Sequence, residues 1–359
     1  MASNTWSPVI DAKRPPAWIG GAQAQVEPCA FHALALRTQG FPDATRIREL
    51  VLSEHQLVRT WGQRDTLHMY AREHWRTYVA ARTFWPPRGR RGGMPSAELV
   101  QWFAQHFEAA GQPLVRSDLF DLIPNDFVAA VSDHPGAGSD PRRFAASRIV
   151  WQLASKGEVV FAGKQGSQQA YVHRSVWHDT DTHFDSDLDA ALAVLKTYLA
   201  AFGPATAADA AHHFGCRVTD TRTWLKLLGD EVAPIRTNDR DDLWMLAKDV
   251  DALEAPQAWP TRLLPGYDTV LMGHKDKRWL VDHAEEPLVW RKSAVVAPTV
   301  LHRGLIVATW NHTVVGKELQ IQVEPLSGWD RTMLPDATLD AQNLAQHLGA
   351  KDVRVDVSP

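Results

Sequence analysis

The sequence has little of what marks secreted, membrane or metal-binding proteins. Its 359 residues include two cysteines, Cys29 and Cys216, too few and too far apart for a disulfide framework or a zinc site. No apolar run approaches the ~20 residues needed to cross a bilayer, and residues 1–18 lack the apolar stretch of a signal peptide. We therefore expect a cytoplasmic protein with no membrane association, no metal and no cofactor.

Net charge is also small, at −4, but it is unevenly distributed. Residues 1–91 hold 13 Lys and Arg against 7 Asp and Glu, whereas the remaining residues hold 25 against 35. A basic face on an acidic body is compatible with DNA binding, because phosphate contacts are local. A solvated surface with a chance asymmetry explains the same counts.

The first quarter of the chain has a helix, helix, short strand order. Pro28 and Gly40 bracket a helix over 28–39, and apolar periodicity predicts a second over 43–58. A short strand at 66–69 and a helix at 73–83 follow. This order is typical of a winged-helix unit.

Two similar patterns follow a basic, breaker-rich linker at 86–95. The first has helices and then a hairpin, predicted at 96–109, 117–123, 142–155, 159–161 and 170–172. The second has helices with Thr206 and Gly215 as caps and then a hairpin, predicted at 188–201, 207–214, 219–228, 232–235 and 243–246. After Pro265 the sequence favours strands, with a turn at 302–304, a strand at 317–326 and a last helix at 338–348.

Four segments in this order resemble the bacterial winged-helix DNA glycosylases, the AlkZ-like azinomycin-resistance enzymes and their relatives. They are GAQAQVEPCAFHALALRTQG, LVRTWGQRDTLHMY, LKTYLAAFGPATAADAAHHFG and LLPGYDTVLMGHKDKRWLVD. The resemblance implies an α+β fold, with three tandem winged helices forming a C-shaped DNA channel and a small β-rich C-terminal module. Combined with the pattern above, the expected divisions are 1–91, 92–186, 187–260 and 261–359.

The family's catalytic signature is two Gln flanking one small apolar residue, which here is Gln23-Ala24-Gln25. Without the resemblance, such a polar stretch would be interpreted as a loop. Gln is no general base, but its carboxamide can accept one hydrogen bond from a water and donate another. In an extended segment, residues 23 and 25 project to the same side, so both can converge on one water or one sugar.

Such a site is too weak to release a normal base, but it suffices for a base that alkylation has made cationic. The resulting prediction is a DNA glycosylase that hydrolyses N7-alkylguanine or N3-alkyladenine by positioning a water. No lysine lies near the motif after Lys13, so a Schiff-base lyase step is not expected. Unhooking of interstrand crosslinks stays open.

Five further residues are candidates for contact with DNA. Arg59, Arg64 and His68 follow the second helix, where the alternative is a surface ion pair or a structural histidine. Lys164 and Gln165 occupy the tip of the predicted wing, where the alternative is a solvated turn. The family usually has Gly where this chain has Asp65, and an acid there would weaken phosphate attraction.

The expected partner is double-stranded DNA with alkylated bases, bound by a monomer. A winged-helix regulator without activity and a protein that shields damaged DNA are the competing functions. A regulator has no need of Gln-Ala-Gln, and it would normally bind paired half-sites as a dimer.

Overall fold

The computed structural model describes residues 20–85, 93–177, 186–238, 240–252 and 261–359. The chain forms two compact units, one of Glu49–Val194 and one of Met1–Arg48 together with Leu195–Pro359. Most of the predicted linker at 86–95, and Lys13, lie outside the described residues. None of the helices in the described ranges is long and apolar enough to cross a membrane.

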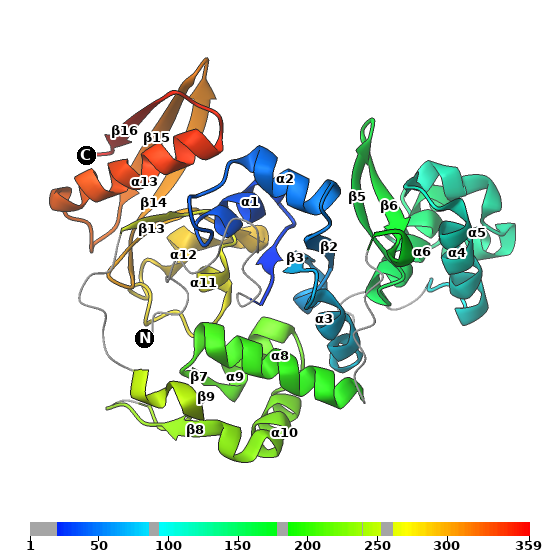
Figure 1. Cartoon of the computed structure of the whole chain (residues 1–359), viewed down its shortest axis with the longest axis horizontal. Helices are drawn as coiled ribbons and strands as arrows, with labels where there is room; N and C mark the ends of the chain where they lie inside the picture. The colour runs from blue at the N-terminus through cyan, green and yellow to red at the C-terminus, as the bar shows by residue number, and fades with distance from the viewer. Residues whose placement is uncertain (1–19, 86–92, 178–185, 239, 253–260) are drawn as a thin grey trace. The chain divides into compact units, whose positions relative to one another are not determined.

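The unit of Glu49–Val194 contains the β2–β3 hairpin, which is followed by a helical group and a three-stranded sheet (Figure 1). Its elements are β2 (Leu57–Trp61), β3 (Leu67–Ala71), α3 (Trp75–Ala81), α4 (Ala97–Ala110), β4 (Leu114–Val115), α5 (Asn125–Ser132), α6 (Pro141–Ser155), β5 (Val159–Gln165), β6 (Gln168–His173) and α7 (Arg174–Trp177). The sheet has the order β4-β6-β5 with antiparallel neighbours. Its buried residues, such as Val160 and Val172, face each other across the ladder, which is why the hairpin could be predicted from apolar runs flanking a turn.

In the other unit, a second helical group begins after Leu195. It comprises the second half of α8 (Asp187–Phe202), followed by β7 (Ala205–Thr206), α9 (Ala207–Phe214), α10 (Val218–Leu228), β8 (Val232–Ile235) and β9 (Leu243–Leu246). Thr206 caps α9 by accepting from the Asp209 N–H, and Gly215 ends the helix with φ of 81°. Both caps and both strands agree with the sequence prediction, because these signals are local.

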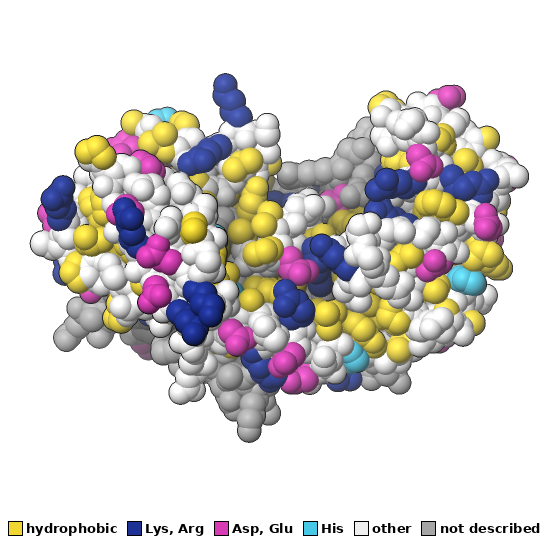
Figure 2. Space-filling model, turned by 90° about the horizontal axis from the view of Figure 1, so that it is seen from above, with side chains coloured by type: hydrophobic (Ala, Val, Ile, Leu, Met, Phe, Trp, Pro, Cys, Tyr) yellow, Lys and Arg dark blue, Asp and Glu magenta, His cyan; other side chains and the backbone are white. Residues whose placement is uncertain are grey.

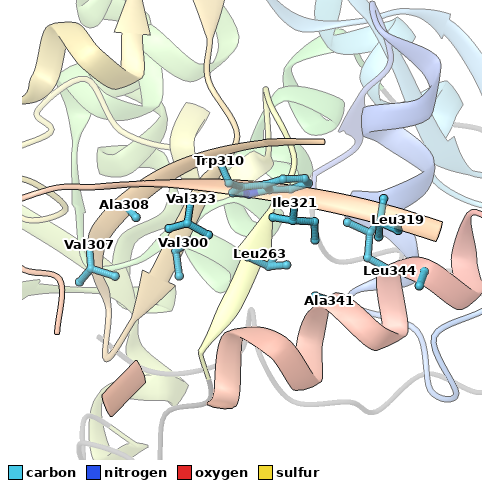
Figure 3. Close-up of a cluster of buried hydrophobic side chains, with 11 residues drawn as sticks. Leu263, Val300, Val307, Ala308, Trp310, Leu319, Ile321, Val323, Ala341 and Leu344 are labelled. Carbon is cyan, nitrogen blue, oxygen red and sulfur yellow. The ribbon is translucent and has the colours of Figure 1, made fainter. Parts of the chain in front are cut away.

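The C-terminal part of the same unit is a five-stranded sheet with one helix packed on it. The strand order is β10-β13-β14-β15-β16, antiparallel except for the β15–β16 pair. The bounds are β10 (Arg262–Leu264), β13 (Thr299–His302), β14 (Leu305–Val315), β15 (Glu318–Pro325), α13 (Leu334–His347) and β16 (Asp352–Val357). Between β10 and β13 lie α11 (Thr269–Met272), α12 (Glu286–Val289), β11 (Trp290–Arg291) and β12 (Val295–Val296). Figure 3 shows the core between this sheet and α13, where Leu263, Trp310 and Leu344 belong to one buried cluster.

Several elements differ from the prediction, and three show why. The helix expected over 43–58 ends earlier, as α2 (Ala44–Leu52), because His55 adopts φ of 53° and the next apolar residues enter β2. The helix α5 and the strand β16 were not predicted. Strand β16 forms only because β15 offers it a partner more than 25 residues earlier in the chain, which no local pattern reveals.

These elements make a mixed helix and sheet fold, which confirms the coarse fold class. The three-winged-helix arrangement and the four divisions at 1–91, 92–186, 187–260 and 261–359 stay predictions.

Candidate active site

The Gln-Ala-Gln segment lies directly before the first helix. Gly20 and Gly21 have φ of 68° and 90°, a backbone conformation that favours glycine, and they lead into β1 (Ala22–Gln23). Helix α1 (Glu27–Ala35) starts two residues after Gln25, with Pro28 in its first turn. A glycine turn before the motif and a proline in the first turn of α1 thus fix where the motif begins and ends.

The two glutamines differ in exposure. Gln23 is 8% exposed and its neighbours Ala22 and Ala24 are fully buried, whereas Gln25 is exposed. The two carboxamides, predicted to converge on one water or one sugar, thus differ in their surroundings: Gln23 is held inside the protein and Gln25 lies at its surface.

Just after α1, Arg37 forms a buried ion pair that anchors the helix. The Arg37 guanidinium donates to both carboxylate oxygens of Asp268, at 2.9 and 2.8 Å, and the two side chains are 1% and 0% exposed. Asp268 also caps α11 by accepting from the Val270 N–H at 3.0 Å. Asp268 therefore has a structural, capping role, and Arg37 is its buried partner.

Aromatic rings enclose another residue of α1, His32. Its ring lies 5.9 Å from Phe41, 6.1 Å from Trp310 and 6.0 Å from His347, measured between centroids. Burial holds the pKa of His32 well below its ordinary value, and the nearby His347 lowers it further. The ring is therefore neutral, and this part of α1 packs as core.

In the unit of Glu49–Val194, the hairpin of β2 and β3 carries Arg59, Arg64 and His68. Arg59 is only 7% exposed and its guanidinium lies 4.9 Å from the Phe161 ring centroid, a cation–π arrangement. His68 is 1% exposed, and burial, reinforced by the charge of Arg64, lowers its pKa to about 3. A neutral His68 brings no positive charge to a phosphate.

The turn of this hairpin explains how the chain accommodates Asp65. Arg64 and Asp65 have φ of 54° and 60°, the region in which glycine is least strained. The Asp65 carboxylate accepts from Trp151 Nε1 at 2.9 Å and lies 3.3 Å from the Arg82 guanidinium. These bonds offset the strain, and the ion pair compensates the negative charge, so the expected weakening of phosphate attraction is reduced.

At the tip of the β5–β6 hairpin, Lys164 and Gln165 are both exposed. Lys164 pairs with Gln169 across the hairpin ladder, and Gly166 has φ of 58° at the turn. Gln165 donates to the Pro113 carbonyl at 3.1 Å. Lys164 therefore projects a cation from the end of β5, while Gln165 also supports the segment that contains Pro113.

Comparison with known proteins decides the family. The family model "DNA glycosylase AlkZ-like" matches residues 17–350. The chain belongs to the AlkZ-like DNA glycosylase family. This confirms the resemblance and the enzyme class that we expected, a hydrolase acting on N-glycosyl bonds.

Two comparisons, one with curated proteins and one with solved structures, match this AlkZ-like glycosylase to Streptomyces sahachiroi. The first matches an interstrand DNA cross-link repair glycosylase, 26% identical over 350 residues, which cover 93% of this chain and 90% of that protein. The second matches the solved structure of the DNA glycosylase AlkZ, with 23% identity and a TM-score of 0.74 over 95% of this chain and 92% of that one. The second comparison establishes the same fold.

Two of the segments that resemble the family meet in the structure, although they are more than 220 residues apart in sequence. Arg37 belongs to the segment that contains Gln-Ala-Gln, and Asp268 to LLPGYDTVLM. In the sequence, the only sign of this contact was that Arg37 and Asp268 are charged residues within largely apolar segments. Pairing them needed the tertiary structure.

Proposed function

We propose that this glycosylase is monofunctional and hydrolyses the N-glycosidic bond of cationic N-alkylated purines, N7-alkylguanine and N3-alkyladenine, in double-stranded DNA. The observation that carries the proposal is Gln23-Ala24-Gln25, held between a glycine turn and α1. A carboxamide cannot take a proton from water at neutral pH, so the site needs a leaving base that is already activated. Alkylation supplies that activation by placing a positive charge on the purine.

The asymmetry of the two glutamines suggests different roles. Gln23, 8% exposed, has little freedom to move and is suited to holding one water in a fixed orientation. Gln25, exposed, can reach the sugar and stabilise the positive charge that develops on it as the bond breaks. Both contributions are larger in the transition state than in the bound ground state.

In this proposal Arg64, Lys164 and Gln165 contact the DNA phosphates. Arg59 and His68, the other two residues expected to contact DNA, are buried and support the hairpin that carries Arg64. In Figure 2, Lys and Arg side chains stand among Asp and Glu side chains, and the described residues on that face form no single basic field. Binding should therefore depend on a few local contacts and weaken as salt rises.

The finer architecture is part of the same proposal. The helices followed by hairpins at α4–β6 and α8–β9 have the element order of winged helices, as does the segment of α1 to β3. We propose that the three units line one C-shaped DNA channel in a monomer. A monomer wrapped on one site needs no paired half-sites.

A single-turnover assay tests the chemistry. A duplex with one N7-methylguanine is incubated with excess protein, and strand cleavage in hot alkali reports base release. Replacing Gln23 or Gln25 with Ala should slow release while leaving DNA affinity nearly unchanged, because neither residue carries charge. The double variant should be slower still, and less than additively if the water held by Gln23 and the sugar contacted by Gln25 react as one unit.

Q25D should keep part of the activity, because a carboxylate can also accept a hydrogen bond and stabilise positive charge on the sugar. Wild-type release by a folded Q23A/Q25A double variant would refute the proposed site. A second arm uses a crosslinked duplex, because the S. sahachiroi relative is a cross-link repair glycosylase. Release of N7-methylguanine without unhooking would assign the chain to simple alkylation damage.

A further inference from the structure

Helix α1 depends on tertiary contacts for its position. It has nine residues, and its N-cap, Val26, makes no side-chain capping bond. Isolated helices of this length are unstable in water, and a missing cap removes a further stabilising contact. Because Gln25 lies two residues before α1, whatever fixes α1 also fixes the position of the Gln-Ala-Gln segment.

The Arg37–Asp268 pair fixes the helix in one orientation. Arg37 uses two parallel hydrogen bonds to Asp268, and its Nη1 also donates back to the Ala33 carbonyl of α1 at 2.9 Å. A bidentate arginine–carboxylate pair restrains rotation as well as distance. The pair therefore locks the C-terminal end of α1 against the turn that precedes α11.

The same turn also contacts the first turn of α1. Burial raises the pKa of the Cys29 thiol, a backbone hydrogen bond from Gly266 acts in the opposite direction, and Asp268 is close enough to raise the pKa slightly further. Gly266 has no room for a side chain, since a Cβ there would lie 2.7 Å from the Val296 carbonyl oxygen. The turn therefore packs closely against β12, and both ends of α1 contact this turn.

We propose that Arg37 and Asp268 are positioning residues for catalysis: through α1 they hold Gln23 and Gln25 in the geometry that base release requires. This inference rests on the proposed function of the two glutamines. A fully buried ion pair adds little net stability, and an apolar pair of similar volume often replaces it without loss. Its value here is geometric, because small displacements of reacting groups slow reactions strongly.

The test separates position from stability. In R37M/D268N no charge is buried, Met fills the arginine volume, and Asn keeps the oxygen that caps Val270. We expect a melting temperature close to that of the wild type, unchanged affinity for DNA, and release of N7-methylguanine slowed by about 10- to 100-fold. R37K, which keeps the charge but not the paired hydrogen bonds, should be folded and intermediate in rate.

A matched control is D209N. Asp209 is also a buried helix-capping carboxylate of the same unit, accepting from the N–H groups of Thr206 and Lys275, but it makes no ion pair with α1. Its replacement should lower the melting temperature and leave the rate of base release near wild type. If D209N and R37K slow release equally at matched stability, the positioning role is refuted.

Combination with the glutamine variants completes the test. R37M/D268N should slow the Q23A/Q25A protein no further, because the groups it positions are gone. If R37M/D268N slows the Q23A/Q25A protein by the same factor by which it slows the wild type, the inference is refuted and the proposed function stays intact. Wild-type release by Q23A/Q25A would instead refute the proposed function itself.

Discussion

His68 gives the sharpest link between burial and a measurable property. Its ring is 1% exposed, stacks at 5.8 Å on Tyr70, and has a pKa lowered from 6.5 to about 3 by burial and by the charge of Arg64. The perturbation we propose is H68F, which keeps an aromatic ring in the stack and removes the titrating group.

The sign follows from which state binds the proton. Between pH 6.5 and about 3, the unfolded chain has a protonated His68 and the folded protein has a neutral one. The unfolded state is therefore favoured as pH falls below 6.5. Two-state linkage gives a loss of about 2 kcal/mol in the free energy of unfolding between pH 7.5 and pH 5 from this residue alone.

The assay is denaturant unfolding of both proteins at the two pH values, followed by tryptophan fluorescence. H68F should lose about 2 kcal/mol less than the wild type on acidification, even if it is less stable at both pH values because the bond to the Thr66 carbonyl is lost. H74F, at an exposed position directly before α3, controls for the exchange of His for Phe. Equal losses in H68F and wild type would show that His68 is not buried in a neutral form.

Two other predictions follow from the hairpins of the same unit. D65A should lower the free energy of unfolding by about 2–3 kcal/mol, because Trp151 Nε1 and Arg82 lose a poorly exposed acceptor. D65G should cost about 1 kcal/mol less than D65A, since glycine tolerates φ of 60°. A denaturation experiment in which D65G is the less stable of the two would contradict this account. K164Q should weaken DNA binding and reduce the salt dependence of log K by about 1, whereas K248Q, an exposed lysine outside the proposed interface, should not; equal slopes in a salt titration would remove Lys164 from the interface.

Local signals determined much of this protein. The caps Thr206 and Gly215, both strands β8 and β9, and the β5–β6 hairpin followed from capping residues, glycine turns and apolar alternation, since each depends on neighbours within a few residues. The Gln-Ala-Gln motif was identified from sequence as well, because the family resemblance is carried by short contiguous segments.

Tertiary structure decided the rest. Only long-range packing could bury Gln23 while leaving Gln25 exposed, remove His68 from solvent, or end α2 early so that Leu57 could join a strand. The pairing of Arg37 with Asp268 is of the same kind. A buried charge is tolerated only where the fold brings an opposite charge to it, so the partner is chosen by the fold and not by its distance along the chain.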